Sequence, residues 1–315
     1  MPTEVRDRLY LIGFLLVAGL LLFLGRNLVQ GSALVTWGIT FGSTAGVAVL
    51  LASLYRLRIE LRASRHELAR KDAELHFAHE VQRALFPRRL PNDGGLEFAA
   101  VCIPARGISG DYYDVLQLPD GRLIFAIADI SGKGISAAIL MANMQAVLRT
   151  LVQNDASPRE VCSRLNYHLY QVTDASKFAT FFYAEWNPAD RRLRYINAGH
   201  HPPILLGSNR GRKLVEGSFP LGMFPESSLE MGEIRLQPGD LLALYSDGIT
   251  EATSRDGEEF GEQRLEAVIE AHAKKPLDEI QRRVLETVQQ WSGSEQEDDC
   301  TLLIIRAAEP KEVKR

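Results

Sequence analysis

Cysteine is scarce in this sequence, and its three cysteines form no metal or disulfide pattern. Cys102, Cys162 and Cys300 are odd in number, lie far apart and form no CxxC pair. This excludes a disulfide scaffold and a cysteine-ligated zinc site. We expect each cysteine to be a small core residue in a reducing, cytoplasmic setting.

The chain also lacks the short motifs of several common enzyme classes. It has no GxSxG around a serine and no HExxH. A P-loop around Lys133 would require Ser or Thr at position 134 and Gly at position 127, but the chain has Gly134 and Ile127. These absences argue against α/β-hydrolases, HExxH zinc proteases and P-loop nucleotide hydrolases.

Charge is nearly absent from the front of the chain. Between Leu9 and Tyr55 the only formally charged residue is Arg26. Residues 1–90 hold 12 basic and 7 acidic residues (+5), so residues 91–315 hold 24 and 33 (−9). A mean hydropathy of −0.09 conceals this division. Because the acidic back lacks a basic stripe, we expect no nucleic-acid partner.

Two uncharged runs in the front predict a transmembrane hairpin over residues 1–55. Residues 9–25 are just long enough to cross a ~30 Å hydrocarbon layer at ~1.5 Å per residue, and residues 33–55 are longer. Arginines flank both outer ends, which places both ends in the cytoplasm. We therefore expect a multi-pass protein of the cell (inner or plasma) membrane. A secretory signal peptide and two buried core helices are the alternatives.

Residues 56–86 predict a helical linker, because they contain neither Gly nor Pro. Leu54, Leu61, Leu68 and Leu75 recur every seven residues, which is a fragment of a coiled-coil seam. The second heptad position, which a coiled coil also requires to be apolar, is poorly filled. The pattern favours a homodimer through this linker, and a solvated amphipathic helix is the alternative.

Residues 87–307 predict a soluble α+β domain, followed by a tail at 308–315. Hairpin-connected strands grouped around helix pairs predict antiparallel sheets covered by helices. Strands are expected at 97–103, 112–118, 122–130, 178–186, 192–197, 203–206, 233–236, 240–245 and 301–306, and helices at 136–152, 157–172, 262–274 and 276–291.

Aspartates recur where apolar strands meet turn residues. Asp111 opens one strand, Asp129 and Asp247 each close one, and Asp298-Asp299 precede the last. Each alone could be an ordinary turn residue. Together, converging carboxylates repel one another unless cations neutralise them. Their oxygens suit Mg²⁺ or Mn²⁺, and two such ions ~4 Å apart can clamp a phosphate and activate a bridging water.

A histidine pair, His200-His201, is a second candidate metal site. Adjacent residues in an extended segment point opposite ways, and the surrounding Gly and Pro predict a tight turn. We therefore favour a supporting role for this pair over metal ligation.

Seven motifs, SGDYYD, ADISGKG, FATFFY, NAGHHPP, PLGM, LYSDGITEA and EDDCTLLII, occur in an order that resembles the SpoIIE-type branch of the protein phosphatase 2C-like (PPM) superfamily. The resemblance covers roughly residues 80–307. It implies an α-β-β-α sandwich of two antiparallel sheets flanked by helices. It also implies a metal-dependent phosphoserine/phosphothreonine phosphatase.

The same resemblance implies the site residues. Asp129 would bridge two metals with the Ile130 carbonyl beside it, and Asp247 and Asp298 would complete the ligands. Asp111 would hold a metal-bound water or a further metal, and Asp299 is a weaker candidate. Many relatives carry a His shortly after the bridging Asp, but here Ser131-Gly132-Lys133 follow. Lys133 is expected near the phosphate, with an exposed turn lysine as the alternative.

The sequence thus predicts a membrane-tethered, metal-dependent protein serine/threonine phosphatase that uses two Mn²⁺ or Mg²⁺ ions. Asp129 and Asp247 are its expected catalytic residues. By the resemblance, its substrate would be a phosphorylated regulatory protein in the cytoplasm, such as an anti-anti-sigma factor. One alternative is a catalytically silent membrane scaffold, which would not need the carboxylates. The other is a metal phosphodiesterase or nucleotidase.

Overall fold

A computed structural model of the chain describes Gly19, residues 33–92, 94–105, 107–153, 156–174 and 176–293, Gln296 and residues 298–309. Apart from Gly19, the first predicted membrane span lies outside these residues. Contacts divide the chain into two compact units, residues 1–73 and residues 74–315. The second unit contains the predicted soluble domain.

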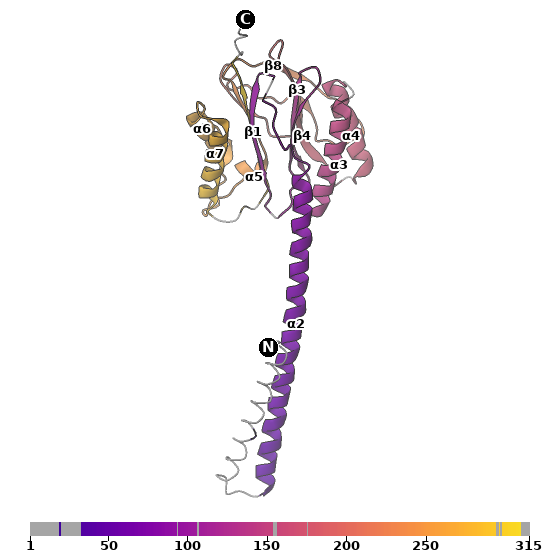
Figure 1. Cartoon of the computed structure of the whole chain (residues 1–315), viewed down its shortest axis with the longest axis vertical. Helices are drawn as coiled ribbons and strands as arrows, with labels where there is room; N and C mark the ends of the chain where they lie inside the picture. The colour runs from indigo at the N-terminus through magenta and orange to yellow at the C-terminus, as the bar shows by residue number, and fades with distance from the viewer. Residues whose placement is uncertain are drawn as a thin grey trace. The chain divides into compact units, whose positions relative to one another are not determined.

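One long helix joins two predicted elements. Helix α2 (Ala33–Arg83) runs for 51 residues, through the second predicted span and nearly all of the predicted linker (Figure 1). Beyond Gly46 it contains neither Gly nor Pro, so no helix breaker interrupts it. The apolar side chains of Trp37, Phe41 and Leu50 are exposed on α2.

Two sheets form the centre of the second unit. Sheet A has the order β1-β10-β9-β6, and sheet B has the order β2-β3-β4-β5-β7, with β8 also paired to β5. Every pairing is antiparallel except that of β5 with β7. The strands are β1 (Leu96–Ile103), β2 (Tyr112–Gln117), β3 (Leu123–Ile130), β4 (Ala179–Asn187), β5 (Arg192–Ala198), β6 (Ile204–Leu206), β7 (Gly217–Ser218), β8 (Gly232–Arg235), β9 (Leu241–Tyr245) and β10 (Cys300–Ala307).

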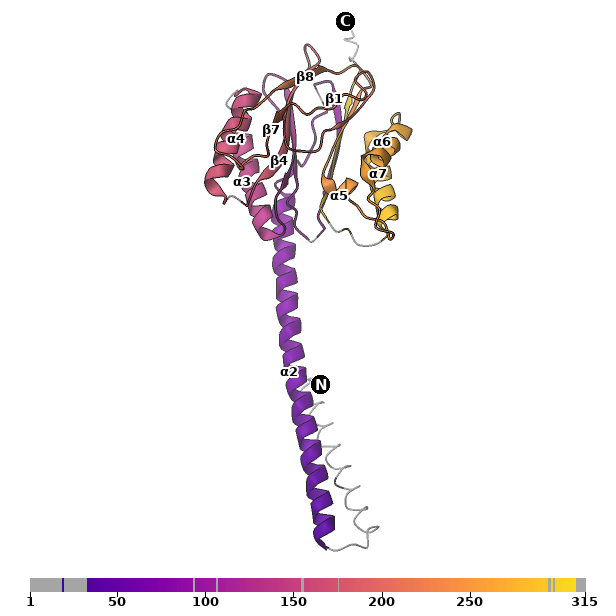
Figure 2. The same ribbon diagram turned by 180° about the vertical axis from the view of Figure 1, so that it is seen from behind.

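Helix pairs cover the outer faces of both sheets. Helices α3 (Ile135–Val152) and α4 (Pro158–Val172) lie against sheet B, and α6 (Gly261–Ala271) and α7 (Leu277–Ser292) lie against sheet A (Figures 1 and 2). The α+β fold and the α-β-β-α sandwich are therefore confirmed. The strands and helices predicted within the soluble domain occur with ends shifted by three residues or fewer, while β7 and the short helix α5 (Asp247–Thr250) were not predicted.

Three apolar layers explain the sequence pattern. One layer lies between the two sheets, and the other two lie between each sheet and its helices. Strand β3 is buried on both faces, which is why its sequence is an almost unbroken apolar run.

By length and composition, the one helix in the described part of the chain that could cross a membrane is α3. Its buried residues, among them Met141, Met144 and Leu148, pack in the layer against sheet B. Helix α3 is thus a core helix of the sandwich. The predicted hairpin is not identified by this criterion.

Candidate active site

The predicted aspartates meet at one end of the two sheets. Asp111 directly precedes β2, and Asp129 is the penultimate residue of β3. Because β2 and β3 are antiparallel, the start of one lies beside the end of the other. Sheet A repeats the arrangement, since Asp247 follows β9 and Asp298 precedes the antiparallel β10.

The aspartates are close enough to perturb one another. Burial, with the charges of Asp247, Asp298 and Asp299, raises the pKa of Asp129 to about 7. Burial and the charge of Asp298 raise the pKa of Asp247. Burial and the charge of Asp129 raise the pKa of Asp111 well above its usual value. Carboxylates held this way ionise together only if a cation compensates them.

The donor set fits a hard divalent cation. Asp111 is 2% exposed, and its Oδ2 has no hydrogen-bond partner among the residues that the structure describes. An orphaned, buried carboxylate oxygen is a ready ligand, because Mg²⁺ and Mn²⁺ prefer oxygen donors. No three His, Cys, Asp or Glu side chains in the described ranges already form a metal-binding group. Within the described ranges, the aspartates are therefore close to one another but do not form a complete metal-binding site.

The carbonyl of Ile130 lies at the same edge. A Cβ at Gly110 would stand 3.1 Å from the Ile130 oxygen and 3.4 Å from the Cβ of Ala137. The glycine therefore lets the loop before Asp111 pass close to this carbonyl. At Gly248, which follows Asp247, a Cβ would stand 2.1 Å from the backbone oxygen of Asp299. Position 248 therefore requires glycine, because any side chain there would clash with the backbone of Asp299.

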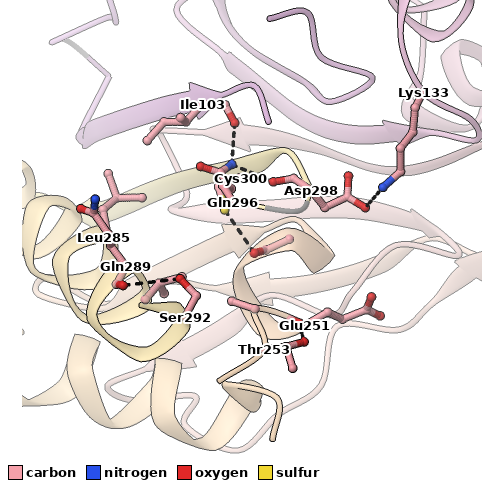
Figure 3. A pocket seen from close by; sticks show the side chains of 13 residues that line it. Ile103, Lys133, Glu251, Thr253, Leu285, Gln289, Ser292, Gln296, Asp298 and Cys300 are labelled. Atoms are coloured by element: carbon pink, nitrogen blue, oxygen red, sulfur yellow. Dashed lines mark hydrogen bonds and ion pairs between the residues drawn. The ribbon is translucent and has the colours of Figure 1, made fainter. Parts of the chain in front are cut away.

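Lys133 connects the two halves of the site. Its Nζ lies 2.7 Å from Oδ2 of Asp298, although both side chains are roughly half exposed. Lys133 belongs to the turn after β3 and Asp298 to the segment before β10, so this ion pair joins sheet B to sheet A. Figure 3 shows the pair at the side of a cavity.

The cavity beside this ion pair measures about 420 Å³. Glu251 and Thr253 lie on one side of it, and Leu285, Gln289 and Ser292 of α7 line another (Figure 3). Its remaining lining residues are Ile103, Gly248, Ala252, Val288, Gln296 and Cys300. The site thus opens into a space with mixed apolar and polar walls.

Asp299 has different partners from its neighbour Asp298. Its Oδ1 accepts a hydrogen bond from the amide of Ala105 at 2.8 Å. Its Oδ2 accepts from the amide of Gly110 at 2.8 Å and from Oγ of Ser109 at 2.9 Å. Both oxygens are therefore engaged by the loop that carries Asp111.

His200 joins the two sheets. It is buried, with Nδ1 2.8 Å from Oγ1 of Thr180 on β4 and Nε2 3.2 Å from the Tyr245 carbonyl on β9. Burial and His201 lower its pKa to about 3, so the ring is neutral. A carbonyl only accepts, so Nε2 donates to it and Nδ1 accepts from Thr180. Thr180 is the register partner of Asp129. The favoured supporting role agrees with these contacts.

Gln82 and Ser109 belong to the site, but the sequence did not single them out. Gln82 lies in the last turn of α2 and is 5% exposed. Its carboxamide forms two hydrogen bonds with the backbone of Ser109. The available signal was a polar residue three and four places before Leu85 and Phe86, on the same face of the predicted linker helix. Such a residue requires a buried partner.

Residues 119–308 match the family model "Stage II sporulation protein E (SpoIIE)". Phosphoserine phosphatase RsbU of Bacillus subtilis is 31% identical over 237 residues, which cover 74% of this chain and 70% of RsbU. The family-model match begins after β2 and includes every later strand and helix of the sandwich, from β3 to β10.

Solved structures share the fold. The RsbU and RsbW domains of Rv1364c from Mycobacterium tuberculosis superpose with a TM-score of 0.60 and 27% identity, over 69% of this chain and 61% of that one. The SiaA-PP2C domain of Pseudomonas aeruginosa has a TM-score of 0.64 and 20% identity, over 76% and 98%. RsbX, solved in complex with magnesium, has a TM-score of 0.52 and 17% identity, over 70% and 99%.

Proposed function

The chain belongs to the SpoIIE family of PP2C-type protein serine/threonine phosphatases, and we propose that it is a membrane-tethered, metal-dependent member. Its substrate would be a phosphoserine or phosphothreonine on a cytoplasmic regulatory protein. The observation that carries the proposal is the group of mutually repelling aspartates at the ends of β2, β3, β9 and β10, of which Asp111 is buried and the others are partly buried. Such a group of carboxylates would bind divalent cations, and the bound cations would attract a phosphate group.

Asp111, Asp129, Asp247 and Asp298, with the Ile130 carbonyl, would hold two divalent cations, Mn²⁺ or Mg²⁺. When bound, the cations would supply the charge that binds phosphate and activates the attacking water. Asp299 is the weakest ligand candidate, because both of its oxygens already accept hydrogen bonds.

Lys133 would bind the substrate phosphate. Its ammonium group lies at the mouth of the site with 55% of the side chain exposed, and it reaches Asp298 across the two sheets. A phosphate oxygen can replace that carboxylate as its partner, because both are anionic acceptors. His200 would keep β4 and β9, and with them Asp129 and Asp247, at a fixed separation.

The substrate proposal rests on the family. RsbU is named a phosphoserine phosphatase, and Rv1364c combines an RsbU domain with an RsbW domain. A small phosphorylated regulator, such as an anti-anti-sigma factor, is therefore the proposed partner. The mixed cavity beside Lys133 and Asp298 offers room for the protein chain around the phosphorylated residue.

Membrane tethering is proposed from the uncharged runs at 9–25 and 33–55. The exposed Trp37, Phe41 and Leu50 of α2 support it, because lipid would cover them. We propose a multi-pass anchor in the cell membrane with the catalytic domain in the cytoplasm. Exposed Leu54, Leu61 and Leu68 support a homodimer through the linker part of α2.

The test uses the full-length chain in detergent micelles. A phosphoserine protein should be hydrolysed in the presence of Mn²⁺ and not after EDTA treatment. Asp129→Asn and Asp247→Asn should abolish turnover while the circular dichroism spectrum stays native. Unchanged turnover in either variant would contradict the site assignment.

The same preparation separates the rival functions. Hydrolysis of nucleotides or phosphodiesters without hydrolysis of phosphoprotein would favour the metal phosphodiesterase. Absence of all Mn²⁺-dependent turnover would favour the scaffold. Labelling of single-cysteine variants from outside intact cells tests the topology, and external labelling of the domain would contradict the hairpin.

A further inference from the structure

The cavity beside the Lys133–Asp298 ion pair is continuous with the site. Its walls include both of these residues and Gly248, which directly follows Asp247. A phosphate bound at Lys133 would therefore lie beside the cavity (Figure 3). Successive residues of a peptide are ~3.8 Å apart, so the first residues on one side of a phosphoserine would reach into it.

Four of the side chains that line the cavity are apolar. Leu285 and Val288 belong to α7, Ile103 is the last residue of β1, and Ala252 follows α5. Val288 is only 6% exposed, but Ile103 is 36% exposed. An aliphatic side chain in the cavity would cover Ile103 and Leu285, and the removal of this apolar surface from water would stabilise the contact.

The volume of the cavity suits side chains of a bound peptide. A cavity of ~150 Å³ holds a benzene molecule, so about 420 Å³ has room for one or two large side chains. Glu251 adds a carboxylate to the wall, and an acidic side chain in the cavity would lie against this like charge. The cavity therefore favours an aliphatic residue over an acidic one.

We infer that this cavity is a specificity subsite, which accepts an aliphatic side chain within two residues of the phosphoserine of the protein substrate. The inference rests on the proposed function, because it takes the neighbouring aspartates as the place of hydrolysis. It adds a local sequence preference to that function. The phosphate is recognised at the site, and the adjacent residue is recognised by the wall that α7, β1 and Ala252 provide.

The experiment uses the full-length chain in detergent micelles with Mn²⁺ and two kinds of substrate. The first is a set of phosphoserine peptides of equal length, with Leu, Ala or Glu at each of the two positions on either side of the phosphoserine. The second is p-nitrophenyl phosphate, which has no neighbouring residue. At one of these positions, we expect kcat/KM for the leucine peptide to exceed that for the alanine peptide about tenfold, with the glutamate peptide lowest.

Two adjacent glutamines of α7 provide a variant and its matched control. Gln289 and Gln290 are both exposed, but only Gln289 is among the described residues that line the cavity. Gln289→Trp should fill the cavity, so the leucine peptide should lose its advantage while hydrolysis of p-nitrophenyl phosphate stays within about twofold of wild type. Gln290→Trp should preserve both activities.

Equal kcat/KM for the leucine and alanine peptides in the wild type would overturn the inference. So would an equal loss of preference in both tryptophan variants. If Gln289→Trp does not fold, Leu285→Gln decides, because it keeps the volume of the wall and makes it polar, and a preference retained in this variant would overturn the inference. Hydrolysis of p-nitrophenyl phosphate without hydrolysis of any peptide would also overturn it, since a subsite for a neighbouring residue must act on peptides. Absence of all Mn²⁺-dependent hydrolysis, including that of a phosphoserine protein, would instead count against the proposed function.

Discussion

Asp129→Asn should stabilise the metal-free protein while it abolishes turnover. Burial and the neighbouring carboxylates raise the pKa of Asp129 from 3.8 to about 7. Each pKa unit corresponds to about 1.4 kcal/mol, so the ionised side chain at pH 8 costs the folded state about 4 kcal/mol. The folded protein binds this proton more tightly than the unfolded chain does. The contribution of this side chain to the free energy of unfolding is therefore fully present below pH 3.8, where it is protonated in both states, and is lost as the pH rises through 7.

The assay is chemical unfolding of the full-length chain in detergent with EDTA, followed by tryptophan fluorescence at two pH values. Asparagine carries no charge, so the variant should gain about 3–4 kcal/mol over wild type at pH 8 and about 2 kcal/mol at pH 5. Asp256→Asn, at an exposed aspartate, should change nothing at either pH. Excess Mn²⁺ should stabilise the wild type more than the variant. A variant less stable than wild type at pH 8, or a gain that does not shrink at pH 5, would refute the reasoning.

Three further substitutions test the packing around the site by chemical unfolding. Arg149→Ala leaves the carboxylate of Asp114, which is 1% exposed and lies 2.7 Å from the arginine Nε, without that partner. The free energy of unfolding should fall by about 3 kcal/mol, and a loss below about 1 kcal/mol would contradict the pairing. Asp299→Ala removes the acceptor of three hydrogen bonds and should cost about 3 kcal/mol. Asp298→Ala breaks a half-exposed ion pair with Lys133 and one local hydrogen bond from the Asp299 amide, and should cost about 1 kcal/mol. Equal losses in the Asp298 and Asp299 variants would contradict the different roles of the two residues.

Most strands and helices of the domain could be predicted from the sequence, but the pairing of the strands could not. Strand β3 could be read from its apolar run because both of its faces are buried. The parallel pairing of β5 with the two-residue strand β7 left no comparable pattern, since so short a strand has no period to detect. The strand-end aspartates stood out because a charge beside an apolar run contrasts with its surroundings.

Side-chain direction was the main quantity missing from the sequence. Asp298 and Asp299 are identical residues in adjacent positions, yet one pairs with Lys133 and the other holds the 105–110 loop. Both residues lie before β10, outside the strand register, so the packing of the surrounding loops decides the partner of each side chain. Gln82 was missed for a related reason. Its partner lies 27 residues away, and only the packed fold brings the two together.

The pairing of β1 with β10 sets the order in which the domain can be completed. All eight residues of β1 pair with β10, and β1 is an edge strand of sheet A. A ribosome releases the chain from its N-terminus, so β1 waits for a partner until nearly the whole domain has been made. Asp298 and Asp299 emerge with that partner. No shorter nascent chain can therefore assemble the full acidic group, and catalytic competence arrives together with the last strand.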